Sequence, residues 1–219
     1  MQNQRDQDPL ERARTAEPHW GPADTVETRL RRQAALLAAA DAVAEDGPGG
    51  LWSQFLRDYT RAADRVVSVH GDTEASTLEW LRPRGIISLL VTEACDDSDA
   101  VEHLTAALAA MNAVTLTLDE ERARRLERLL RSLATLLPDA FAELLPAPHA
   151  QYPAGAATAF LTPGLLYRDW APPTALPGHA RDDDERLALL TLYGRVRQLD
   201  VRDDDRWWRW GESNPRPSL

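Results

Sequence analysis

The sequence contains no lysine: all 25 of its basic residues are arginine. The chain therefore cannot carry a Walker-type phosphate-binding lysine, a Schiff-base lysine or a lysine general base. Its single cysteine, Cys95, excludes a disulfide framework and any metal site built from cysteines alone. No apolar run reaches the roughly 18–20 residues that span a bilayer, and the polar N-terminus is not followed by the apolar core of a secretory signal. We therefore expect a cytoplasmic protein without a membrane partner.

Several catalytic and metal-binding motifs are also missing. The chain has no G-x-S-x-G nucleophile elbow and no G-x-G-x-x-G dinucleotide fingerprint. None of its five histidines stands four residues from another, as a zinc-binding helix requires. Three acidic clusters, at 96–99, 182–185 and 203–205, lack the spacing and turn glycine of a calcium loop, and the first two are predicted to cap helices. The net charge of −10 argues against nucleic acid as a partner.

Hydrophobic residues make up 43% of the chain, which is typical of a globular protein, and many of them recur at helical spacing. One helix is predicted over Val26–Val43, with Asp24 as its N-cap, and a second from Trp52 to near Val69. A further helix should follow Asp119 and present a leucine stripe over 126–137. These helices give the sequence a helical N-terminal pair and a later amphipathic helix.

Strand-like segments lie between these helices. Thr77–Leu81 and Ile86–Val91 are the first two, and the second is nearly continuous in apolar residues, as expected of a strand covered on both faces. A helix should follow the acidic cluster, with Asp99 and Glu102 at capping-box spacing. Ala113–Leu118 reads as the next strand. Strand, helix and strand within about thirty residues form one βαβ unit, so the predicted fold class is α/β with a partial Rossmann-like layer.

The sequence also predicts how the chain is divided. A Pro-rich segment near the C-terminal third should be an irregular arm, apart from a short strand at Ala159–Leu161, because seven prolines fall within it. Gly211–Pro217 resembles a peptide read antisense through the T-arm of a tRNA gene, which suggests non-native read-through. The expected parts are a loose leader over 1–22, an α/β domain over 23–145, the Pro-rich arm over 146–182, a C-terminal helix over 183–200 and a disordered tail over 201–219.

Two stretches carry a family resemblance. Residues 81–87 read Leu-Arg-Pro-Arg-Gly-Ile-Ile, and residues 105–114 read Thr-Ala-Ala-Leu-Ala-Ala-Met-Asn-Ala-Val. They resemble the R-P-x-G-V-V strand start and the A-L-A-A-G-N-x-V strand entry in the cofactor-binding half of the aldehyde dehydrogenase superfamily. Gly71-Asp72-Thr73 stands where pyrroline-5-carboxylate (glutamate-semialdehyde) dehydrogenases carry G-P-T. Weaker echoes of the family's first helix are Trp20, Arg29, Leu30, Arg32 and Ala40-Asp41.

The chain departs from this family at the positions that do its chemistry. The resemblance places the oxyanion-binding W-N-F-P loop at 93–96, which reads Glu-Ala-Cys-Asp here. It places the cofactor-binding Lys-Pro-x-Glu at 117–120, where only Glu120 is retained. The family's nucleophilic cysteine belongs to a second domain, and Cys95 lies in the crossover loop instead, where neighbouring carboxylates should raise its pKa. By position alone, the resemblance assigns NAD or NADP contacts to Glu93, Thr117 and Glu120, and it assigns no catalytic residue and no metal.

Three functions remain open at this stage. The first is a degenerate aldehyde-dehydrogenase-like domain that is not catalytic by itself, like the module found at the end of some bifunctional proline-oxidising enzymes. The second is the cofactor-binding half of a split NAD(P)-dependent semialdehyde dehydrogenase, an oxidoreductase whose catalytic half is a protein partner. The third is a helical interaction protein that presents the 126–137 stripe or the stripe that starts at Trp52 to a partner.

Overall fold

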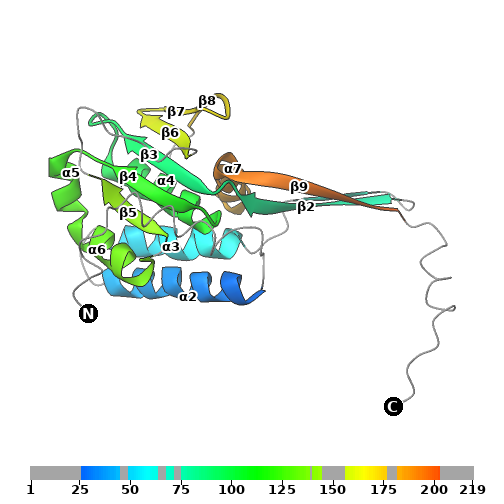
Figure 1. Ribbon diagram of the computed structural model, residues 1–219, viewed down its shortest axis with the longest axis horizontal. Coiled ribbons are helices and arrows are strands. Elements are labelled where there is room, and N and C mark those ends of the chain that lie inside the picture. Colours follow the sequence, from blue (N-terminus) through cyan, green and yellow to red (C-terminus); the bar gives the residue numbers. More distant parts are fainter. Residues whose placement is uncertain are drawn as a thin grey trace, which may run out of the picture.

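The computed structural model describes residues 26–44, 49–63, 68–71, 75–138, 140–144, 156–176 and 182–202, and its architecture is mixed α/β (Figure 1). Its helices are α2 (Val26–Val43), α3 (Gly49–Ala62), α4 (Asp97–Ala109), α5 (Glu120–Arg125), α6 (Glu127–Leu136) and α7 (Asp183–Tyr193). Its strands are β1 (Ser68–Gly71), β2 (Ala75–Pro83), β3 (Ile86–Val91), β4 (Ala113–Thr117), β5 (Phe141–Leu144), β6 (Ala157–Thr162), β7 (Leu165–Arg168), β8 (Ala171–Ala175) and β9 (Gly194–Arg202). Within these ranges, no helix has the length and apolar character needed to cross a bilayer.

The strands form two sheets. The larger has the order β5-β4-β3-β6-β7-β8: its first four strands are parallel, and β7 and β8 extend it antiparallel. Ile87 of β3 pairs with Val114 of β4 on one side and with Ala157 of β6 on the other. The β3–α4–β4 crossover is the predicted βαβ unit, which is confirmed. The smaller sheet, β1-β2-β9, contains the predicted strand at Thr77–Leu81.

α2 and α3 lie one below the other beneath the larger sheet (Figure 1). α3 packs on α4, and α2 packs on both α3 and α6. The core between these layers takes up the stripe of α3, including Phe55, Leu56 and Tyr59. It also takes up most of the leucine stripe, namely Leu126, Leu129, Leu130, Leu133 and Leu137. The hypothesis that these two stripes face a partner is therefore wrong, because the fold itself buries them.

Aspartates cap α4, α5 and α7, as predicted, although not at every expected residue. Asp96, rather than Asp99, is the N-cap of α4, and its carboxylate accepts from the Asp99 amide at 2.8 Å. Glu102 takes no part in a capping box and is buried at 1% exposure. At α7 the full capping box is present, with Asp182 and Glu185 each accepting from the other's backbone amide.

The Pro-rich segment is more regular than the sequence suggests. The expectation of an irregular chain is wrong for residues 157–175, which form β6, β7 and β8. Ala159, Leu161 and Leu166 turn inward and are fully buried, and Gly164, at φ 72°, makes the tight turn between β6 and β7. The prolines at 172 and 173 lie in β8, the edge strand, where a missing amide donor breaks no ladder hydrogen bond.

Both predicted helix ends near the smaller sheet are too late in the sequence. α3 ends at Ala62 rather than near Val69, and α7 ends at Tyr193 rather than near 200. Gly194 is the C-cap of the second of these helices and has an extended backbone, and it packs so closely on β2 that a Cβ there would lie 2.3 Å from the Leu81 side chain. The chain then continues as β9, which pairs with β2 along its whole length and forms with it a long ribbon that projects from the body (Figure 1). The predicted leader, the Asp24 cap and the tail from 203 lie outside the described residues.

Candidate functional site

The residues that the resemblance assigns to the cofactor lie at the carboxyl ends of β3 and β4. Parallel α/β sheets bind ligands at this edge. Glu93 follows β3 and Glu120 follows β4, and both reach one open hollow of about 470 Å³. The residues that line this hollow are Glu93, Asp119, Glu120, Glu121, Arg124 and Arg125. The structure therefore brings two of the three assigned residues together.

Thr117, the third assigned residue, lies on the sheet itself. It pairs in register with Leu90 of β3, which pairs with Phe160 of β6, which in turn pairs with Tyr167 of β7. Paired residues share a sheet face, so these four side chains make one row across four strands. Phe160 and Tyr167 are each 41% exposed, with ring centroids 6.4 Å apart. We call this set the aromatic row.

A buried arginine, which the sequence did not single out, fixes the loop between β3 and α4. Arg122 of α5 is only 1% exposed. Its guanidinium donates to the backbone carbonyls of Thr92 (2.9 Å), Glu93 (3.2 Å) and Cys95. Its Nε lies 3.0 Å from the carboxylate of Asp97. The loop that would carry the family's oxyanion-binding asparagine is thus held by a side chain of the same chain.

Asp119 completes the setting of this arginine. It is the N-cap of α5, as predicted, and accepts from the Arg122 amide at 2.8 Å. Its other oxygen lies 3.3 Å from an Arg122 terminal nitrogen, so Asp119 both starts the helix and pairs with its buried cation. Nothing in the local sequence distinguishes Arg122 from Arg124 and Arg125, which are exposed.

At the switch point of the sheet, the end of β3 and the following loop bond to β6. Strand order reverses between β3 and β6, which is where an open α/β sheet forms its ligand crevice. Here the Thr92 amide and the Cys95 thiol both donate to the carbonyl of Leu161 in β6, at 3.0 and 3.4 Å. β6 is followed by the turn into β7 rather than by a helix, so the helix that begins beside this crevice is α4, and its start carries the carboxylates of Asp96, Asp97 and Asp99.

Cys95 is buried in this loop and donates its thiol to a carbonyl. It is 5% exposed and also lies 3.3 Å from the Thr92 hydroxyl. Burial raises the pKa of its thiol, and the charge of Asp99 adds to that rise. The predicted direction is confirmed, but burial, rather than the neighbouring carboxylates, is the main cause.

The hollow has an acidic character. Four carboxylates line it beside two arginines, and Arg125 is already held by Asp97 (2.7 and 2.9 Å) and by Glu121 (2.9 Å). The hydrogen bond from Arg125, together with that from Arg122, lowers the pKa of Asp97. Carboxylates that keep their charge accept hydroxyl groups, such as those of a ribose, but repel a phosphate. Within the described residues, no three His, Cys, Asp or Glu side chains are grouped so that they could hold one metal ion together.

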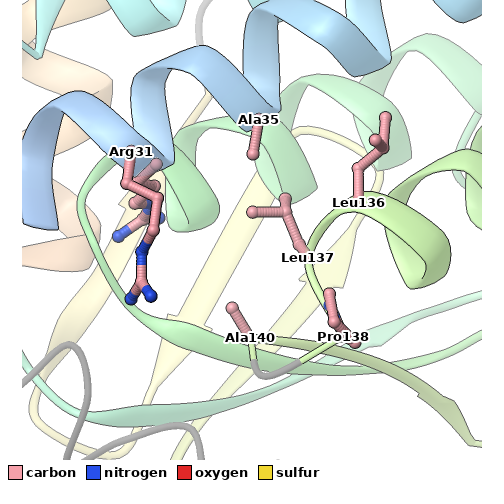
Figure 2. Close-up of a pocket in the computed structure, with 7 residues that line it drawn as sticks. Arg31, Ala35, Leu136, Leu137, Pro138 and Ala140 are labelled. Carbon is pink, nitrogen blue, oxygen red and sulfur yellow. The ribbon is translucent and has the colours of Figure 1, made fainter.

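A second, smaller hollow of about 130 Å³ lies between α2 and the end of α6. Figure 2 shows Arg31 extending from α2 beside Leu137 and Ala140. Burial lowers the pKa of the neighbouring Arg32, which is 4% exposed. The described lining of this hollow consists of two arginines and five apolar residues, without a carboxylate.

Comparison with known proteins places the fold. No protein-family profile and no curated protein sequence matches the chain. Among solved structures, it is similar to proline utilization A (PutA) from Bdellovibrio bacteriovorus inactivated by N-propargylglycine, with a TM-score of 0.52 and 16% identity over 64% of this chain and 17% of that one. It is similar to PnpE in complex with nicotinamide adenine dinucleotide, with a TM-score of 0.52 and 16% identity over 65% of this chain and 34% of that one.

A third similar structure is the glyceraldehyde-3-phosphate dehydrogenase GapN from Methanocaldococcus jannaschii, complexed with NADP, with a TM-score of 0.47 and 14% identity over 64% of this chain and 36% of that one. The chain thus spans about a third or less of the PutA and PnpE chains. At such identities, the likeness concerns the fold alone. The fold of the chain is aldehyde-dehydrogenase-like, as the resemblance of 81–87 and 105–114 predicted.

Proposed function

We propose that this chain is a degenerate aldehyde-dehydrogenase-like domain that is not catalytic by itself. The acidic start of α4 at the switch point supports this proposal. Arg122 holds the β3–α4 loop through three carbonyls, and that loop bonds in turn to Leu161 of β6. A dinucleotide at this edge would meet the carboxylates of Asp96 and Asp97 at the start of α4, which repel a pyrophosphate.

The test is thermal unfolding of the purified chain with increasing NAD or NADP. A ligand present at 100 times its Kd should stabilise the fold by about 2.7 kcal/mol. For a chain of this size, that corresponds to a rise in Tm of several degrees. We expect no saturable rise at millimolar cofactor, and no aldehyde-dependent reduction of NAD or NADP. Aldehyde-dependent reduction of NAD or NADP by the purified chain would contradict the non-catalytic proposal, and a saturable rise in Tm that Glu120→Gln removes would favour the second candidate instead.

The second candidate is the cofactor-binding half of a split NAD(P)-dependent semialdehyde dehydrogenase. The convergence of Glu93 and Glu120 on one hollow favours it, because the two carboxylates could accept ribose hydroxyls. PnpE and GapN were solved with NAD and NADP respectively, which adds weight to a nicotinamide cofactor. Under this candidate, Glu120→Gln should abolish any cofactor-induced rise in Tm, whereas Glu127→Gln, on the exposed side of α6, should leave it unchanged.

Both candidates include a protein partner, and the aromatic row is the surface that we assign to it. Two neighbouring aromatic rings that are each 41% exposed on one face of the sheet favour cover by another domain. The partner would be a neighbouring proline-oxidising domain for the first candidate, or a catalytic dehydrogenase half for the second. Co-purification with the product of an adjacent gene of either kind should be lost in a Phe160→Ser/Tyr167→Ser variant, and retention would contradict this assignment.

A further inference from the structure

A cluster of arginines lies at the opposite end of the larger sheet from the acidic hollow. Arg84 follows β2 and precedes β3, and its guanidinium carbon lies 4.8 Å from the centre of the Trp170 ring. Arg195, the second residue of β9, donates to the backbone carbonyl of Arg84 at 3.4 Å. Arg168 ends β7 beside the start of β6, so the pairing of β3, β6 and β7 brings it to the same end.

Three N–H donors of this cluster have no acceptor among the described residues. They are Nε of Arg84, Nε of Arg168 and the indole Nε1 of Trp170, all shielded from solvent. Arg168 uses its terminal nitrogens on the Leu192 and Pro172 carbonyls and on the Thr174 hydroxyl. No hydrogen bond joins the terminal nitrogens of Arg84 to any side chain or carbonyl in the described ranges. Buried donors without acceptors are uncommon in folded proteins, so these donors leave room for a further acceptor at the cluster.

The charges of the cluster point the same way. Burial lowers the pKa of the Arg84 guanidinium, and the nearby charges of Arg195 and Arg168 lower it further. Asp169 is the carboxylate that acts against them, and one of its oxygens already accepts from the Thr158 amide at 2.8 Å. In addition, Arg195 stands directly across the β2–β9 pair from Arg82, a like-charge placement that costs free energy.

We propose that Arg84 and Arg195 form a binding site for a phosphate group, with Trp170 holding the Arg84 guanidinium in place and Arg168 reinforcing the positive field. A planar guanidinium pairs with two oxygens of a phosphate at once, and a dianion relieves the repulsion among three cations better than a single carboxylate can. The site is independent of the function proposed above, because it lies at the other end of the sheet and uses none of the same residues.

Inorganic phosphate is the probe. The Tm of the purified chain is measured against phosphate concentration at fixed pH, with sodium chloride at matched ionic strength as the reference. We expect a saturable rise in Tm with phosphate beyond the chloride reference. In Arg84→Gln and Arg195→Gln, the apparent Kd for phosphate should weaken by at least about tenfold, since each variant removes one charged partner. Arg131→Gln, an exposed arginine on α6, should bind phosphate like the wild type.

Arg195 is exposed, so Arg195→Gln leaves the core unchanged and should fold like the wild type. A rise that chloride reproduces, or one that Arg131→Gln weakens as much as Arg84→Gln does, would mean general charge screening and would overturn the site. Equal stabilisation by malonate would overturn the assignment to phosphate. NAD also carries phosphates, so a cofactor-induced rise that Arg84→Gln removes and Glu120→Gln retains would support this site rather than the acidic hollow.

Discussion

Replacing Arg122 by methionine, which keeps the apolar length of the side chain but removes its charge, tests whether this arginine holds the β3–α4 loop. The change leaves three backbone carbonyls without their donor and separates Asp97 and Asp119 from their shared cation. Breaking a buried ion pair by removing one partner costs about 3–5 kcal/mol.

The lower end of that range applies here. The side chains of Asp97 and Asp119 retain 24% and 20% exposure, so water can solvate them in part. Asp97 also keeps its hydrogen bonds from Arg125. We therefore expect Arg122→Met to lose about 3 kcal/mol of unfolding free energy. At about 2–4 °C per kcal/mol for a chain of this size, the Tm should fall by about 6–12 °C.

Two assays check this expectation. Urea unfolding gives the free energy of unfolding. The rate at which a thiol reagent modifies Cys95 reports whether the β3–α4 loop has opened, since Cys95 lies in this loop and its thiol is buried. Arg125→Met is the matched control: it also touches Asp97, but its side chain is 46% exposed, so it should change both readouts little. The reasoning fails if Arg122→Met unfolds like the wild type with Cys95 still protected, or if the two variants behave alike.

Three further predictions follow from other contacts. Arg125 and Arg122 lower the pKa of Asp97, so its carboxylate stabilises the fold above the unfolded pKa, and this stability is lost as the pH falls below about 4. In Asp97→Asn, the free energy of unfolding by urea should therefore fall less between pH 6 and pH 3 than in the wild type. Tyr59→Phe removes the 2.6 Å hydrogen bond from a buried hydroxyl to the buried carboxylate of Glu102, and should cost about 1–3 kcal/mol in the same assay. Met111→Gly should raise the free energy of unfolding by about 1 kcal/mol, because Met111 holds φ 70°, a region that glycine enters without strain; a loss of stability would mean that packing of the methionine outweighs the strain.

The sequence motifs that resembled the dehydrogenase family predicted the fold because they contain the residues that join its elements. Asn112 is fully buried and accepts from the Arg84 amide at 2.7 Å, while its own amide donates to the carbonyls of Ala107 and Tyr193. It therefore connects the start of β3 to α4 and α7. Gly85, at φ 117°, makes the turn that enters β3. These local requirements leave a pattern in the sequence that can be recognised without a structure.

Strand pairing between distant segments leaves a weaker pattern. β9 pairs with β2 across more than a hundred residues, and its first half continues a helical apolar pattern from Leu187 and Leu190 through Tyr193 to Val196. Periodicity alone therefore predicts a helix that continues past Tyr193. The structure shows that the chain becomes extended at Gly194, where it packs against Leu81. The edge strand β8 was missed because its prolines are tolerated only at an edge, and an edge is defined by the rest of the sheet.

The candidate site was the hardest part to predict because Arg122, the residue that fixes its loop, contacts residues that are far from it in the sequence. Glu93 and Glu120 could be placed by alignment with a motif, since both lie in the short segments that come after the strands of the βαβ unit. Arg122 stands two residues after one of them, yet its partners lie 25 to 30 residues earlier and are mostly backbone carbonyls, which every residue possesses. Because every residue has a backbone carbonyl, the sequence does not show which carbonyls a buried cation will bind. The role of such a cation can therefore be recognised only in the folded structure. The same reasoning applies to the arginine cluster at the other end of the sheet, where Arg84 and Arg195 are 111 residues apart in the sequence. They meet because β9 pairs with β2, and Arg168 joins them because β7 pairs with β6.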